Sequence, residues 1–227
     1  LYKEPRFYAS VGYDRGTYEV DGKEIILYLR GDELHGSTLK ETDEYQSCTG
    51  YLCQKWIPKA STYNATSNSF SYYYYAYPYL RLPELYLSYA EADFEYNGSL
   101  SAQSIEYINR VRERCGLPTF QDSWALAGGI PTGQKLRKVL HQERSIEFLF
   151  EGRRFHDLRR WKEAFEVMNK QPRSWNRDGK TAEEFYRVIE ANQGGRKRIF
   201  ESPKSYWMAV PMSEINKNPN LVQNPGY

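Results

Sequence analysis

Helical periodicity in the middle of the chain constrains the fold more than any other feature. In YLRLPELYLSYAEADFEYNG, residues 79–98, apolar residues recur at spacings of three and four. The pattern predicts an amphipathic helix that starts close to Pro83, since proline is tolerated in a first turn, and that ends at Gly98. The predicted buried stripe of this helix is Leu82, Leu85, Tyr89, Ala92 and Tyr96.

Three more helices are predicted after this one, over about residues 99–115, 133–150 and 154–170. Ser99 or Ser101 can cap the second helix, and Gly152 separates the third from the fourth. The first connection is only a few residues long, so the first two helices should be antiparallel neighbours. The four helices therefore predict two hairpins of tetratricopeptide size, with Trp161 of the fourth helix in the core.

The two flanks of this helical region lack a sustained helical period. Residues 1–78 are predicted to form short strands, such as YEV and EIILYL, joined by long loops. Residues 79–171 hold the hairpins, and residues 172–227 are predicted to form a β-hairpin and an extended tail. In that hairpin EFYRVIE pairs with RIFE around a QGG turn, and Trp207 of the tail is expected in the core. The predicted fold class is mainly α.

Composition excludes several functional classes. The chain has 227 residues and a net charge of +2, which argues against nucleic-acid binding as the main task. No apolar run approaches the roughly 20 residues of a membrane span. The histidines lack metal-ligand spacing and no glycine-rich loop could cradle phosphate, so neither a metal nor a cofactor is expected. Cys48 and Cys53 could pair in an oxidising compartment.

Glu143 and Glu147 lie one turn apart on the apolar side of the third predicted helix. Buried carboxylates need partners, and the arginine-rich segment that follows supplies them. We therefore expect a structural ion-pair network rather than the paired carboxylates of a retaining glycosidase, which remains an alternative. The members of the expected network are Glu143, Glu147, Arg153, Arg154, Asp157 and Arg160.

Aromatic residues are the strongest candidates for ligand binding. Sugar rings have apolar faces that stack on aromatic side chains, and tyrosine and tryptophan suit wet interfaces as well as cores. SYYYYAYPY, residues 71–79, contains six tyrosines. In an extended run, alternate tyrosines face opposite ways, so one set should pack beneath the first helix and the other is open to a ligand. The candidate ligand-binding residues are Trp56, Tyr63, Tyr73, Trp124 and Trp175.

Five segments, taken in order, resemble the SusD/RagB-like family. They are EPRFYASVGYD (4–14), YLRLPELYLSYAEADFEYNG (79–98), IEYINRVRERCGLP (105–118), LHQERSIEFLFEGRRFHDLRRW (140–161) and VPMSEINKNPNLVQNPGY (210–227). The resemblance spans nearly the whole chain and corresponds to the carboxy-terminal half of such a protein. Family members usually carry Ala where this chain has Pro83 and Cys115.

The resemblance implies a helical fold with tetratricopeptide-like pairs. It also implies non-enzymatic capture of glycans or oligosaccharides at the outer-membrane surface of Bacteroidetes-type bacteria. The implied partner is a SusC-like TonB-dependent transporter, and the implied membrane attachment is a lipid anchor in the amino-terminal half, which we expect to be absent here. A tetratricopeptide-like scaffold that binds only protein is the second functional hypothesis.

Overall fold

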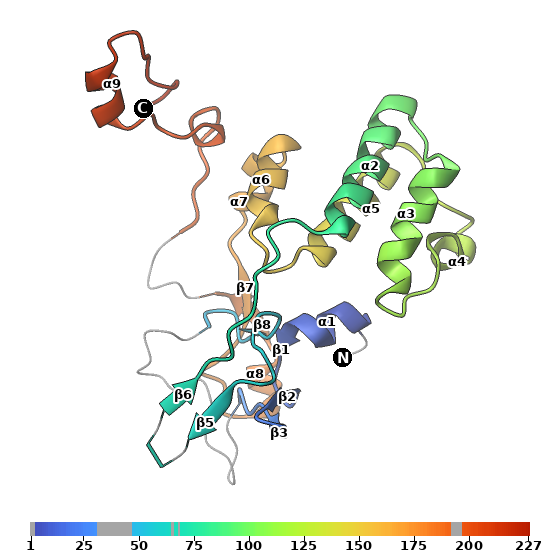
Figure 1. Cartoon of the computed structure of the whole chain (residues 1–227), viewed down its shortest axis with the longest axis vertical. Helices are drawn as coiled ribbons and strands as arrows, with labels where there is room; N and C mark the ends of the chain where they lie inside the picture. Colours follow the sequence, from blue (N-terminus) through green and yellow to red (C-terminus); the bar gives the residue numbers. More distant parts are fainter. Residues whose placement is uncertain (1–2, 31–46, 65, 68, 192–196) are drawn as a thin grey trace. The chain divides into compact units, whose positions relative to one another are not determined.

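The computed structural model describes residues 3–30, 47–64, 66–67, 69–191 and 197–227 (Figure 1). Within these ranges the chain forms two compact units. The first is built from residues within 1–38 and 51–151, and the second from residues within 39–50 and 152–227. Each unit buries a hydrophobic cluster of its own, so each has an interior that can be considered separately.

An antiparallel helical hairpin dominates the first unit (Figure 1). Helix α2 (Leu82–Asn97) ends at Gly98, whose φ of 71° is left-handed, and α3 (Ala102–Glu113) begins after Ser101, whose hydroxyl accepts a hydrogen bond from the N–H of Ser104. Asp93 fastens the turn by accepting from the Ser101 N–H at 2.7 Å and from the Ser104 hydroxyl. These hydrogen bonds, that of Ser104 first, hold the pKa of Asp93 well below its usual range. The predicted hairpin is confirmed.

The buried face of α2 differs from the predicted stripe. Leu87, Ala90 and Phe94 face the core and are at most 4% exposed, and Glu91 beside them is 8% exposed. Apolar residues occur on both sides of this helix, so spacing alone could not identify the side that packs against α3. The predicted stripe is wrong, because it lies on the exposed side: Leu82, Leu85, Tyr89, Ala92 and Tyr96.

Two further helices complete the core of the first unit. Helix α4 (Phe120–Ala125) is short and was not predicted, whereas α5 (Gly133–Glu147) matches the third predicted helix and packs against α2. Phe120 at the start of α4 is only 1% exposed, which explains why this short helix is held in place. The buried core residues are Leu87, Ala90, Phe94, Ile108, Val111, Phe120, Leu136, Leu140 and Phe148.

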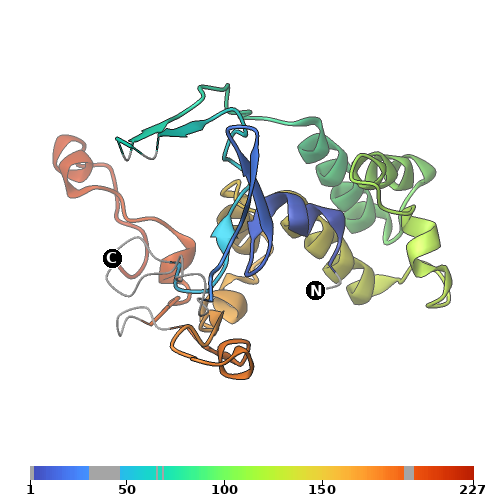
Figure 2. The same cartoon turned by 90° about the horizontal axis from the view of Figure 1, so that it is seen from below.

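The remainder of the first unit consists of short strands and one helix. The strands were predicted, and the helix was not. Helix α1 (Pro5–Ser10) is too short to produce a visible period. Strand β1 (Val11–Gly12) pairs with β4 (Leu52–Cys53), and β5 (Thr62–Asn64) pairs with β6 (Ser69–Ser71). Strands β2 (Thr17–Val20) and β3 (Lys23–Ile26) form the blue hairpin of Figure 2. All these pairs are antiparallel.

The second unit begins with a broken helix. The fourth predicted helix is divided into α6 (Arg153–Arg160) and α7 (Ala164–Met168), because Lys162 adopts a left-handed φ of 58°. The small cluster of this unit consists of Leu158, Ala164 and Phe200, with Trp161 partly buried against it. The expected core position of Trp161 is confirmed. The expected pairing of this segment with α5 joins residues of different units and stays a prediction.

The predicted β-hairpin near residue 190 is wrong. Strand β8 (Val188–Glu190) pairs with β7 (Arg173–Trp175), and residues 182–185 form α8 (Ala182–Phe185) instead of strand. The backbone of residues 198–201 does not pair with any described strand and is hydrogen-bonded instead to the side-chain amides of Asn169 and Gln171. Asn169 exchanges two hydrogen bonds with the backbone of Phe200, at 2.8 and 3.1 Å, which replaces a strand ladder. The predicted QGG turn lies outside the described residues.

The chain end folds on itself through side-chain amides. It contains a 3₁₀ turn, η1 (Lys204–Tyr206), and a short helix, α9 (Met212–Lys217). The Gln223 amide donates to the carbonyl of Val210 at 2.9 Å and accepts from its N–H at 2.8 Å. Trp207 is 55% exposed, so its expected place in the core is wrong. Extended segments of this kind provide no period from which burial could be predicted.

The corrected face of α2 can be tested by substitution. Phe94→Ala should lower the free energy of unfolding by about 3–5 kcal/mol, since it removes a ring from a packed core. Tyr96→Ala should change it by less than about 0.5 kcal/mol, because that ring is 90% exposed. Urea denaturation of both variants measures the difference. Comparable losses would show that the exposed stripe is buried after all.

Candidate functional site

The tyrosine run that follows β6 lies at the surface. Every residue from 72 to 80 is exposed. Tyr72 and Tyr74 are 80% and 93% exposed, whereas Tyr73 and Tyr75 are 57% and 38% exposed. Exposure therefore alternates along the run as predicted, but every tyrosine in it is exposed to some extent. The expectation that one set is buried beneath the first helix is wrong, because no described element of this unit covers either set.

Trp56 contacts the tyrosine run and holds it in place. Its ring lies 4.6 Å from that of Tyr77, and its indole N–H donates to the carbonyl of Phe150 at 2.8 Å. The Tyr75 hydroxyl donates to the Trp56 carbonyl at 3.0 Å. The polar edge of this indole is therefore occupied by the protein itself. Trp56 holds the tyrosines in place, and only the remainder of its ring is left for a ligand.

The β5–β6 hairpin extends the aromatic surface. The ring of Phe70 lies 6.5 Å from Tyr63 and 4.8 Å from Tyr72. Tyr63 and Phe70 are 49% and 39% exposed. The backbone N–H of Tyr73 donates to the hydroxyl of the fully buried Ser61 at 3.2 Å, which fixes the run to the base of the hairpin. We call this set the tyrosine surface: Tyr63, Phe70, Tyr72, Tyr73, Tyr74, Tyr75 and Tyr77.

The structure brings three of the five predicted ligand-binding residues together, namely Trp56, Tyr63 and Tyr73. Trp124 packs against the helical core and lies under the ammonium of Lys135, at 5.4 Å. Trp175 belongs to the second unit, where its ring meets that of Tyr186 at 5.6 Å. Roles for these two tryptophans in binding remain predictions.

A buried ion-pair cluster is the other unusual feature of the first unit. Glu143 and Glu147 on α5 are 6% and 2% exposed. The Nη1 atom of Arg6 lies 2.8 Å from Oε1 of Glu143 and 3.5 Å from Oε2 of Glu147. Arg112 of α3 contacts the other oxygen of Glu143 at 2.9 Å. Both carboxylates are thus paired, as burial of charge demands.

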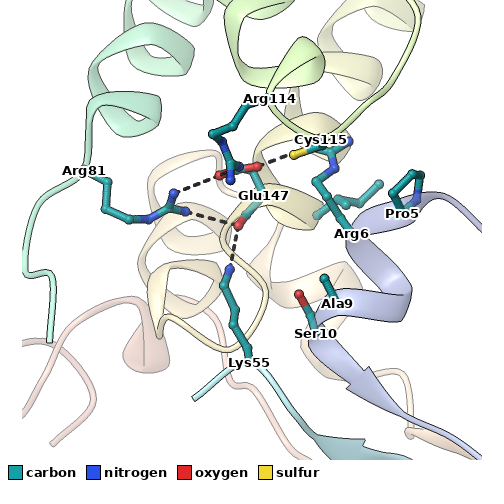
Figure 3. Close-up of a pocket in the computed structure, with 10 residues that line it drawn as sticks. Pro5, Arg6, Ala9, Ser10, Lys55, Arg81, Arg114, Cys115 and Glu147 are labelled. Carbon is teal, nitrogen blue, oxygen red and sulfur yellow. Dashed lines mark hydrogen bonds and ion pairs between the residues drawn. The ribbon is translucent and has the colours of Figure 1, made fainter. Parts of the chain in front are cut away.

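Glu147 also receives side chains from two other segments (Figure 3). Nη1 of Arg81 and Nη2 of Arg114 lie 2.9 and 2.7 Å from its Oε1 atom. Lys55 donates to the backbone carbonyl of Glu147 at 2.9 Å and contacts Glu151 at 2.5 Å. Arg81 joins the same carboxylate of Glu151 at 2.7 Å. The cluster therefore fastens α5 to the chain before α2, to the end of α3 and to the loop after β4.

The arginines of the cluster are held in the charged state. Burial by itself lowers the pKa of Arg6, but the hydrogen bonds and charges of Glu4 and Glu143 outweigh it and raise the pKa above its ordinary value. The same balance, with Glu151 as the main partner, raises the pKa of Arg81. Neither guanidinium loses its proton in any pH range in which a protein is folded.

The expected network and the observed one share their carboxylates. The sequence did not predict Arg6, Arg81, Arg112 and Arg114 as partners of the two glutamates. They come from segments far apart in the sequence, so no local spacing could join them, although each falls within a motif that carries the family resemblance. The roles predicted for Arg153 and Arg154 toward the two glutamates stay predictions. Within the second unit, Asp157 pairs with Arg160 at 3.0 Å.

The predicted pairing of Cys48 with Cys53 is absent from the structure. Cys48, Cys53 and Cys115 are free thiols in the structure. Burial is the main cause that raises the pKa of Cys115, and the charge of Glu147 adds to it. In the part of the chain that the structure describes, no helix is long and apolar enough to cross a membrane, and no group of acidic, histidine and cysteine side chains gathers as metal ligands do.

Comparison with known proteins decides the family. The model of the SusD family matches residues 2–227. The chain belongs to the SusD family. The resemblance read from the sequence is confirmed, and so is the mainly helical fold. The solved structure of BT4246 superposes with a TM-score of 0.81 at 31% identity, over 99% of this chain and 38% of BT4246.

Two more SusD-like proteins show how much of a relative this chain represents. BF0978 from Bacteroides fragilis, a SusD-like carbohydrate binding protein, is 26% identical with a TM-score of 0.66, over 96% of this chain and 41% of BF0978. The SusD-like protein P2 of Formosa agariphila is 28% identical over 150 residues, which is 65% of this chain and 25% of P2. This SusD-family chain thus spans well under half the length of its relatives.

Replacement of one glutamate tests the ion-pair cluster. Glu147→Gln keeps the shape but removes the only carboxylate that Arg114 contacts among the described residues and a buried counter-charge shared by Arg6 and Arg81, so the free energy of unfolding should fall by about 3 kcal/mol or more. The matched control is Glu106→Gln, which removes a 50% exposed carboxylate paired with Arg110 and should cost less than about 0.5 kcal/mol. Chemical denaturation of the two variants gives both values. A loss below 1 kcal/mol for Glu147→Gln would contradict a structural role.

Proposed function

We propose that this chain is part of a non-enzymatic, cell-surface carbohydrate-binding protein, and that its tyrosine surface contacts the glycan. The observation that carries the proposal is the row of exposed rings from Tyr72 to Tyr77, flanked by Tyr63 and Phe70. Soluble proteins seldom expose contiguous apolar side chains unless the surface binds something. Here the rings also carry hydroxyl groups, which offer hydrogen bonds at the edge of each stacking face.

Sugars match this surface better than purely apolar ligands do. One face of a pyranose ring presents C–H groups that stack on an aromatic ring, while the hydroxyls around its rim need polar partners. Tyrosine supplies both from one side chain that loses little conformational freedom, since it has only two side-chain torsions. Several rings in a row suit an oligosaccharide, because successive sugar residues can occupy successive tyrosines. Trp56 contributes by holding Tyr77 and Tyr75 in place.

Family membership supports the same proposal. The relative BF0978 is a SusD-like carbohydrate binding protein, and its structure aligns with nearly all of this chain. By resemblance to the family, we propose that the captured oligosaccharide is delivered to a SusC-like TonB-dependent transporter at the outer-membrane surface. Attachment through a lipid anchor outside these residues belongs to the same proposal. Trp124 and Trp175 are further candidates for contacts with the glycan.

The ion pairs of Glu143 and Glu147 support binding of the glycan without hydrolysis. A retaining glycosidase needs one carboxylate free to attack the sugar and another that donates a proton. Glu143 and Glu147 instead contact several arginines, and these contacts leave neither carboxylate free to attack a sugar. Incubation with oligosaccharides should therefore release no reducing sugar. Release that disappears in Glu143→Gln would establish the glycosidase alternative.

A protein-binding scaffold is the second candidate function, and one observation favours it. The outer side of α2 exposes a row of large apolar side chains at helical spacing, a surface that suits another helix. The members of this row that are at least 46% exposed are Leu82, Leu85, Tyr89 and Tyr96. A scaffold without a sugar-binding role would bind no oligosaccharide at the tyrosine surface.

Calorimetric titration with a panel of oligosaccharides tests the proposed function. A glycan that binds should lose roughly three- to tenfold in affinity in Tyr74→Ala, since an aromatic contact contributes about 0.5–1.5 kcal/mol. Tyr96→Ala is the matched control, because its ring is 90% exposed and lies on α2. It should leave the affinity unchanged. Equal affinity in wild type and Tyr74→Ala would remove the tyrosine surface from the proposal, and silence across the panel would contradict carbohydrate binding by this chain.

A further inference from the structure

A pocket of about 350 Å³ opens beside the ion-pair cluster (Figure 3). It lies within the first unit, between α1, the end of α3 and the last turn of α5. Its volume is at the lower end of the range of small-molecule sites, which suits a ligand about as large as one sugar residue. The polar residues that line it are Arg6, Ser10, Lys55, Arg81, Arg114 and Glu147.

The charges around this pocket do not cancel. Four cationic side chains line it, against the single carboxylate of Glu147. Glu4, Glu143 and Glu151, which pair with these cations but do not line the pocket, neutralise part of the excess positive charge. Counted with those partners, the printed ion pairs join five cations and four carboxylates and leave one positive charge: Arg6, Lys55, Arg81, Arg112 and Arg114 against Glu4, Glu143, Glu147 and Glu151.

Two hydrogen-bond donors in the wall are available to a ligand. The side chain of Ser10 belongs to a residue that is only 7% exposed, and among the described residues its hydroxyl has no hydrogen-bond partner. Arg114 makes one contact, from Nη2 to Glu147, although a guanidinium carries five N–H donors. Its side chain is 55% exposed, so the remaining donors can be reached from solvent. The hydroxyl lies in the pocket wall, where an acceptor on a ligand can reach it.

We propose that this pocket binds the carboxylate of an acidic sugar, a uronate. The carboxylate would accept hydrogen bonds from the free side of the Arg114 guanidinium and from the Ser10 hydroxyl, and it would neutralise the excess positive charge. Planar carboxylates fit the fork of a guanidinium and form hydrogen bonds stronger than those between neutral groups. Glu147 does not oppose this binding, because its own charge is matched by Arg81 and Arg6. The proposal rests on the proposed function, and it selects acidic glycans as the ligand class.

Titration of the chain with D-glucuronate, D-glucose and acetate tests the pocket. Glucuronate should bind saturably and at least about tenfold more tightly than glucose, which has a neutral hydroxymethyl group in place of the carboxylate. It should also bind more tightly than acetate, which lacks the ring. Because the site is open to solvent, the affinity should fall as sodium chloride is raised from 20 to 300 mM. Equal binding of glucuronate and glucose, or no binding of glucuronate, would overturn the proposal.

Two variants test whether glucuronate binds in this pocket. Arg114→Gln and Ser10→Ala should each weaken glucuronate binding by about tenfold. Arg110→Gln is the control, since it removes a 52% exposed arginine from the same helix and should leave binding unchanged. Ser10→Ala removes a hydroxyl that has no partner, so the fold should be retained even if Arg114→Gln perturbs Glu147. Wild-type affinity in a folded Ser10→Ala would overturn the assignment.

The same titrations separate this proposal from the proposed function. Tyr74→Ala should leave the binding of free glucuronate unchanged, because the tyrosine surface is not part of the pocket wall. If a neutral oligosaccharide binds through Tyr74 while glucuronate does not bind, the proposed function stands and the pocket assignment fails. If glucuronate binds and is lost in Ser10→Ala while no oligosaccharide responds to Tyr74→Ala, the pocket stands and the tyrosine surface fails.

Discussion

The pairing of Glu143 and Glu147 with arginines is the interaction on which the first unit depends. An unpaired buried carboxylate would destabilise the fold by several kcal/mol, so each one requires cations from elsewhere in the chain. The cations arrive on α1, on the residue before α2, on the end of α3 and on the loop after β4. One turn of α5 is thereby joined to four separate segments of this unit.

The candidate binding surfaces both follow from this arrangement. Arg81 ends the tyrosine run and starts α2, so the contact of Arg81 with Glu147 fixes one end of the exposed rings. Trp56 comes directly after Lys55, which is held by Glu151, and it supports the other side of the same run. The pocket lies where the arginines converge. These charge pairs thus place an aromatic surface and a cationic pocket in one unit, and we propose that the two contact different parts of an acidic oligosaccharide.

The parts of the fold that could be predicted were those with local signals. Gly98 and Ser101 mark the ends of adjacent helices through their own backbone chemistry, and the first hairpin was predicted correctly from them. The buried side of α2 was not, because Leu85 and Phe94 are both apolar and only tertiary packing chooses between their faces. Arg6 and Arg114 were missed as partners of Glu147 because they are separated from it by long stretches of sequence. The tyrosines were predicted as a candidate site. The exposure of both sides of the run could not be predicted, because it depends on which other elements pack against them.

The claim that most needs a direct test is that the tyrosine surface contacts a sugar. The most direct measurement is a nuclear magnetic resonance titration of the chain, with its tyrosine rings isotopically labelled, against an oligosaccharide that binds. The account predicts that ring signals of Tyr72, Tyr73 and Tyr74 shift together and saturate, while those of Tyr96 and Tyr107 on the helical hairpin stay unchanged. Saturable binding that leaves the signals of Tyr72 to Tyr74 in place would contradict it.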